Sequence, residues 1–197
     1  MSPAHLATAF ATLIAPVPFA EAAVGLLRAR HDSAARRGVP AHVTLLGPLA
    51  TGDLVRAADA FAGVLAHTAA PLVRFVKVGS LNGSMCLLPE DPGPLMELSR
   101  ALHAVSPLSA GPGRPSHRVP HMTVARGSYD RRQVERTLEA RLPLAGPLGS
   151  PLLLLSQPDR PVSVVATLAW RDLSERGADH ELCVSAHTMF RAAPSSA

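Results

Sequence analysis

Apolar residues alternate, or recur three or four positions apart, along almost the whole chain. Runs of the first kind, bounded by Pro, Gly or Asn, predict strands, and runs of the second kind predict helices. The predicted strands are Leu6–Ile14, His42–Pro48, Leu72–Val78, Met85–Pro89, Val119–Arg126, Leu148–Ser156, Val162–Trp170 and Glu181–Phe190. The predicted helices are Phe19–His31, Leu54–Leu65, Pro92–Val105 and Arg131–Leu142.

Two segments between these elements carry turn or loop signals. Asn82-Gly83 separates two apolar runs, and this dipeptide is the strongest short-range signal for a hairpin. Residues 106–120 are rich in Gly, Pro and Ser and predict a loop. The loop contains Arg114, His117 and Arg118. The sequence gives equal weight to two roles for these side chains, closing over a ligand and lying on the surface without a function.

A short motif occurs twice, as Pro40-Ala41-His42-Val43-Thr44-Leu45 and as Pro120-His121-Met122-Thr123-Val124. The two histidines are 121 − 42 = 79 residues apart. Adding 79 to the helix near 53–66 and to the hairpin at 72–89 gives 132–145 and 151–168, where similar elements are predicted. Each half then runs helix, histidine strand, helix, two strands. The repeat predicts two lobes related by a pseudo-two-fold axis, with both histidine strands facing one central cleft.

The composition fits one globular unit. With 197 residues, 47% of them hydrophobic, the chain can bury one sizeable core, and we expect a single domain over residues 1–191 with a flexible tail at 192–197. Met1–Glu21 has no Lys or Arg, so no secretory signal is expected, and no apolar run is long enough for a membrane helix. Cys86 and Cys183 lack metal-ligand spacing, which favours free thiols in a reducing cytoplasm.

The net charge of +4 comes almost wholly from arginine, since Lys77 is the only lysine. A mild positive field suits an anionic substrate such as a phosphate ester or an RNA end. The arginines are scattered along the sequence, however, which favours a bias of composition over a binding patch.

The repeated motif predicts acid–base chemistry. Side chains two residues apart on a strand share a face, so His42 lies beside Thr44 and His121 beside Thr123. One imidazole can take a proton from an attacking hydroxyl or water while the other protonates the leaving oxygen of a phosphodiester. The threonine hydroxyls can stabilise the charge on the phosphate oxygens, and no step needs a metal.

The segments PAHVTLLGP (Pro40 to Pro48) and PHMTVAR (Pro120 to Arg126) resemble the two His-x-Thr motifs of the 2H phosphoesterase superfamily, in particular its 2'-5' RNA ligase-like branch. The resemblance implies an α+β, bilobal fold with an antiparallel sheet in each lobe and helices on the outer faces. It also implies a metal-independent phosphodiesterase without a cofactor, acting on 2',3'-cyclic phosphates or 2'-5' bonds in RNA or small nucleotides. His42 and His121 would be catalytic, and Thr44 and Thr123 would bind phosphate. No protein partner is evident, and a monomer is expected.

Other interpretations remain open. The same site could join RNA ends, or the cleft could bind RNA without turning it over. A metallohydrolase is disfavoured, because no carboxylate or extra histidine accompanies either motif. The segment His31-Asp32-Ser33 is similar in sequence to the His-x-Thr motifs, but it has no counterpart in the other half of the repeat. Strand alternation puts Arg126 on the same side as Met122 and Val124, away from His121, which favours a surface or salt-bridge role.

Overall fold

The structure, a computed structural model, describes residues 9–109, 119–158 and 160–172. The strands are β1 (Phe10–Pro16), β2 (His42–Ala50), β3 (Leu72–Leu81), β4 (Ser84–Pro89), β5 (Met122–Ala125), β6 (Leu144–Pro147), β7 (Leu152–Ser156) and β8 (Ser163–Thr167). The helices are the 3-10 turn η1 (Pro18–Ala20), α1 (Glu21–His31), α2 (Ser33–Arg36), α3 (Leu54–Leu65), α4 (Gly93–Val105) and α5 (Arg131–Glu139).

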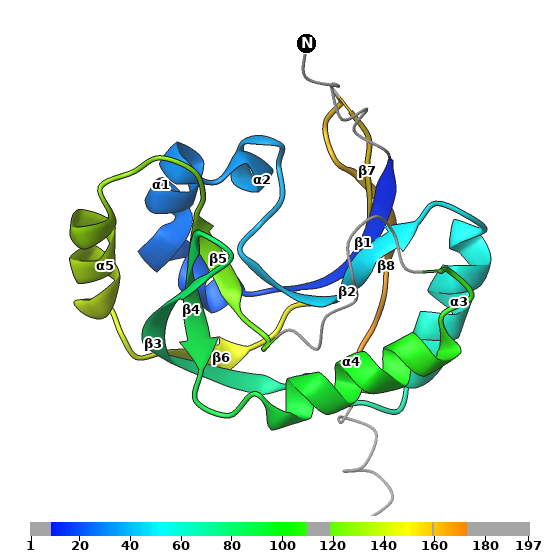
Figure 1. The fold of residues 1–197 in the computed structure, drawn as a ribbon. Helices are drawn as coiled ribbons and strands as arrows, with labels where there is room; N and C mark the ends of the chain where they lie inside the picture. Colours follow the sequence, from blue (N-terminus) through cyan, green and yellow to red (C-terminus); the bar gives the residue numbers. More distant parts are fainter. Residues whose placement is uncertain (1–8, 110–118, 159, 173–197) are drawn as a thin grey trace, which may run out of the picture.

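The strands form one antiparallel sheet in the order β6-β3-β4-β5-β2-β1-β7-β8 (Figure 1). The pairing of β2 with β5 lies at its centre, with three further strands on each side of that pair. In the β2–β5 ladder Val43 is paired with Met122. The predicted α+β fold with duplicated antiparallel sheets is therefore confirmed, and the two halves meet along the histidine strands.

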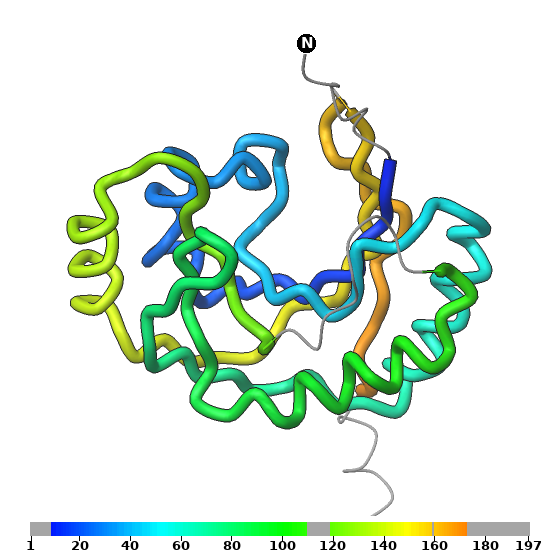
Figure 2. The backbone as a smooth tube through the Cα atoms, in the orientation of Figure 1, coloured from blue at the N-terminus to red at the C-terminus, as the bar shows by residue number. Residues whose placement is uncertain are grey.

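The repeat differs from the predicted one in where it starts and in how its strands are shared. The order β1-α1-β2-α3-β3 corresponds to β4-α4-β5-α5-β7, because β1 and β4 each flank a histidine strand. The last strand of each repeat crosses over, so that β3 pairs with β4 and β7 pairs with β1. The first helices are exchanged too: α1 contacts β5 and α4 contacts β2, as the traced backbone also shows (Figure 2).

Local signals in the sequence predict several boundaries well. The residue before α3 and the residue before α5 are both aspartates, Asp53 and Asp130. In each case the carboxylate accepts a hydrogen bond from a backbone N–H of the first turn, at 3.0 Å. The turn between β3 and β4 has positive φ angles at Asn82 (49°) and Gly83 (76°), as a two-residue hairpin of this kind requires.

Other boundaries differ from the prediction. The helix predicted to reach Leu142 ends at Glu139, and the four residues of β6 follow it shortly afterwards. Their sequence, Leu-Ala-Gly-Pro, has no apolar alternation, and β3 supplies the pairing that makes it a strand. The short helix α2 was also missed. The predicted strand Glu181–Phe190, the tail, Cys183 and the loop residues Arg114, His117 and Arg118 lie outside the described residues.

The main core lies between the sheet and the longer helices. Val43 and Met122 are fully buried in it, and α1, α3, α4 and α5 contribute to the same cluster, so these helices cover one face of the sheet. Helix residues of this core include Val24, Phe61, Leu98, Leu102, Val134 and Leu138. The neighbours of Val43 and Met122 along each strand face the other side. No helix in the described part of the chain is long and apolar enough to cross a membrane.

Two glycine substitutions test this packing. A Cβ at Gly146 in β6 would lie 2.6 Å from Cδ1 and 2.9 Å from Cβ of Phe19, whose ring packs against Phe75. Gly146→Ala should lower the free energy of unfolding by about 1–3 kcal/mol. Gly63→Ala in α3 meets no atom within 4 Å and should raise that free energy by about 0.5–1 kcal/mol. Urea denaturation measures both, and equal effects would contradict the packing described.

Candidate active site

The register of β2 and β5 brings the two His-x-Thr motifs together. Because Val43 pairs with Met122 in an antiparallel ladder, the next positions along the strands place His42 opposite Thr123 and Thr44 opposite His121. All four side chains lie on the face opposite the helix-covered core. The pseudo-two-fold axis passes through the Val43–Met122 pair, so each histidine meets the threonine of the other motif.

Both imidazoles are oriented by the same backbone contact. His42 Nδ1 lies 2.8 Å from the carbonyl oxygen of Pro40, and His121 Nδ1 lies 2.9 Å from that of Val119. A carbonyl oxygen only accepts hydrogen bonds, so these contacts assign the proton of each neutral ring to Nδ1. Nε2 is then the nitrogen on each ring that can accept or return a proton.

The pKa of His42 is lowered from 6.5 to about 4. Burial of the ring is the main cause, because it disfavours the charged imidazolium. The hydrogen bond to Pro40 raises the pKa, Arg28 and Arg126 lower it, and Asp32 raises it. His42 is therefore neutral at pH 7, in the state that can accept a proton.

The two threonines differ in exposure. Thr123 is only 7% exposed, whereas Thr44 is open to solvent. Thr123 is also paired with Cys86 of β4, which puts the thiol on the same face. Burial raises the pKa of Cys86 to about 11, so this cysteine is a neutral thiol and no nucleophile at neutral pH.

Helix α1 fixes the backbone that leads into the first motif. Arg28 Nη2 donates to the carbonyl oxygen of Val39 at 3.1 Å, and Glu21 Oε2 accepts from the N–H of Ala41 at 3.0 Å. The carbonyl oxygen of Ala41 accepts from the N–H of Val17 at 2.7 Å. The Pro40 carbonyl that orients the His42 ring is thus held from both sides.

Asp32 connects this segment to the second motif. It forms an ion pair with Arg28 at 2.9 Å, and both side chains are only 1% exposed. Arg126, directly after β5, approaches Asp32 Oδ1 at 3.7 Å and donates its backbone N–H to the carbonyl oxygen of His31. The predicted salt-bridge role of Arg126 is confirmed.

Neither Arg28 nor Asp32 was predicted to support the site, and no role was assigned to the segment around Asp32. The available signal was their spacing, since an arginine and an aspartate four residues apart share one face of a helix. Nothing in the pattern indicated that this face is buried. Nη1 of Arg28 is buried without a hydrogen-bond partner, so the packing holds this guanidinium in spite of one unsatisfied nitrogen.

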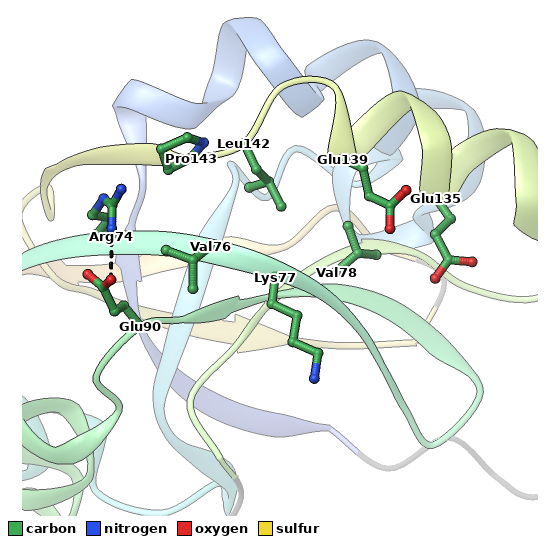
Figure 3. Close-up of a pocket in the computed structure, with 9 residues that line it drawn as sticks. All are labelled: Arg74, Val76, Lys77, Val78, Glu90, Glu135, Glu139, Leu142 and Pro143. Carbon is green, nitrogen blue, oxygen red and sulfur yellow. Dashed lines mark hydrogen bonds and ion pairs between the residues drawn. The ribbon is translucent and has the colours of Figure 1, made fainter.

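A pocket of about 690 Å³ lies elsewhere, between β3 and α5 (Figure 3). Its lining contains none of the four motif residues. The lining residues are Arg74, Val76, Lys77, Val78, Glu90, Glu135, Glu139, Leu142 and Pro143. Within the described ranges, no group of three or more His, Cys, Asp or Glu side chains is arranged to hold a metal ion.

Comparison with known proteins places these features in a family. Residues 15–150 match the family model of the 2'-5' RNA ligase superfamily. None of the curated proteins compared with the sequence matches it.

Solved structures share the fold. The structure of E. coli LigT with 3'-AMP matches with a TM-score of 0.55 and 16% identity, over 83% of this chain and 98% of that one. The E. coli LigT structure with ATP matches with a TM-score of 0.54 and 15% identity, over 83% and 98%. A structure described as a phosphoesterase gives 0.54 and 15%, over 84% and 99%.

Asp32→Asn tests the buried ion pair. The amide keeps the shape of the side chain but leaves the Arg28 charge uncompensated, so the free energy of unfolding should fall by about 3–5 kcal/mol. The matched control is Glu90→Gln, which breaks the exposed Arg74–Glu90 pair and should change that free energy by less than about 0.5 kcal/mol. Chemical denaturation at pH 7 measures both. A loss at Asp32 no larger than at Glu90 would contradict the assigned role.

Proposed function

Since the chain belongs to the 2'-5' RNA ligase superfamily, we propose that it is a metal-independent phosphodiesterase that opens 2',3'-cyclic phosphates or cleaves 2'-5' bonds in RNA or small nucleotides. One observation carries the proposal. His42 is the first residue of β2 and His121 directly precedes β5, the register of the two strands puts both on one sheet face, and each ring is held through Nδ1 by the carbonyl two residues before it.

The proposed roles follow from protonation. Neutral His42 accepts a proton on Nε2 from the water that attacks phosphorus. As the new P–O bond forms, the bond to the 2' or 3' oxygen breaks, and protonated His121 donates its Nε2 proton to that leaving oxygen. The products are a phosphomonoester and a free hydroxyl. The hydroxyls of Thr44 and Thr123 donate to the non-bridging oxygens, where negative charge accumulates.

A nucleotide substrate is supported by the related fold. The E. coli LigT structures that share it were determined with 3'-AMP and with ATP. Joining of RNA ends uses the same proposed groups, with a 5'-hydroxyl in place of water as the attacking group. A binding module without turnover differs from both in forming no product.

The first test is hydrolysis of 2',3'-cyclic AMP in excess EDTA. Wild-type protein should form a phosphomonoester, and His42→Ala and His121→Ala should each lower kcat/KM by about 10²–10⁴-fold. The control is His103→Ala, an exposed histidine of α4, which should retain wild-type activity. Adding an RNA with a 5'-hydroxyl end tests joining in the same assay. Full activity in either motif variant would refute the assignment.

The pH dependence distinguishes the two histidines. Because the free-enzyme pKa of His42 is about 4, the acidic limb of kcat/KM should fall near pH 4 rather than near the ordinary histidine value of 6.5. An acidic limb at or above pH 6.5 would show that His42 is not the base.

A further inference from the structure

We propose that Lys77 is a specificity residue of this site, which binds a second anionic group on the substrate, on the His121 side of the reacting phosphate. The inference rests on the proposed function and adds to it. It gives the preferred substrate class as nucleotides that carry a phosphate in addition to the one that reacts.

Strand register places Lys77 on the face of the histidines. In the β3–β4 ladder Lys77 pairs with Leu88. In the β4–β5 ladder Leu87 pairs with Met122, so the next position puts Leu88 opposite His121. Lys77, Leu88, His121 and Thr44 therefore follow one another across four strands on one face.

Gly79 affects the space between Lys77 and His121. A Cβ at Gly79 would lie 2.7 Å from Cδ1 of Leu88, which shows that the Leu88 side chain leans over the glycine. Gly79 is paired with Cys86, in the row next to that of Lys77. Leu88 thus leans out of the line that joins Lys77 to His121.

The ammonium group of Lys77 is available to a ligand. The side chain is exposed, and the ion pairs among the described residues are Arg28–Asp32, Arg74–Glu90 and Arg126–Asp32. Lys77 also lines the pocket between β3 and α5, and in Figure 3 its side chain extends from β3 away from Glu135 and Glu139 of that pocket. An exposed ammonium group on the site's face is a natural contact for a phosphate.

Lys77 breaks the pseudo-symmetry of the site. Across the axis, Pro16 pairs with His42 as Leu88 is opposite His121. Beyond Ile14–Leu152 the register shifts, because the N–H of Gly149 donates to the carbonyl oxygen of Pro16 at 2.8 Å, so Gly149 takes the position equivalent to Lys77. At these described positions a lysine lies on the His121 side and a glycine on the His42 side, so a substrate with two phosphates has a preferred direction of binding.

The reach of lysine decides which phosphate it contacts. Strands lie about 4.8 Å apart, so the Cα atoms of Lys77 and His121 are separated by roughly 10 Å. A lysine side chain spans roughly 6 Å, too little to reach a phosphate held between the two imidazoles. It can reach a second phosphate on the same nucleotide, such as a 5'-phosphate.

Calorimetric binding of two product analogues tests this assignment without turnover. Wild-type protein should bind adenosine 2',5'-bisphosphate more tightly than 2'-AMP. Lys77→Ala should weaken binding of the bisphosphate about tenfold or more, as expected for one lost charge-assisted contact, and change 2'-AMP binding less than about twofold. Lys77→Arg should keep most of the preference. Arg74→Ala is the control, since it removes the same charge from the same strand at a residue paired with Glu90.

Equal weakening of both ligands by Lys77→Ala, or loss of the preference in Arg74→Ala, would overturn the assignment. In kinetics, Lys77→Ala should raise KM for a 5'-phosphorylated 2',3'-cyclic nucleotide. The same variant should leave KM for 2',3'-cyclic AMP, which lacks the second phosphate, unchanged. A wild-type protein that hydrolyses neither substrate refutes the proposed function, while the binding difference still decides the role of Lys77. If the protein binds neither analogue, both the proposed function and the role of Lys77 are refuted.

Discussion

The pairing of β2 with β5 is the constraint on which the site depends. Each His-x-Thr motif alone supplies an imidazole and a hydroxyl on one face of a strand. The antiparallel Val43–Met122 pair puts both motifs on the same face and sets each histidine opposite the threonine of the other motif. A shift of one residue in this register would turn one motif into the core, so packing of Val43 and Met122 also specifies the geometry of the site.

The exchange of elements between the halves connects the candidate site to the stability of the fold. Helix α1 precedes β2 in the chain but packs against β5, and its Arg28 and Glu21 hold the backbone before His42. Asp32, directly after the helix, forms an ion pair with Arg28. The contact of Asp32 with Arg126 extends this connection to the end of β5. The same burial that stabilises this region keeps His42 neutral, because a charged ring there would lose its hydration.

Much of the fold and part of the candidate site could be predicted from local sequence. Alternation and turn residues are local properties, so the histidine strands, the Asn82-Gly83 turn and the helix Leu54–Leu65 were found. Strand exchange and β6 depend on partners distant in the chain, which periodicity does not encode. The burial of Arg28 and Asp32 is likewise a tertiary effect, and their spacing alone is equally typical of a solvent-exposed helix.

The most direct test of the account is an NMR titration of the imidazole nitrogens in isotopically labelled protein. Both His42 and His121 should be found as Nδ1–H tautomers when neutral, and His42 should titrate near pH 4. A neutral Nε2–H tautomer at either ring, or a His42 pKa at or above 6.5, would contradict the proposed acid–base pair.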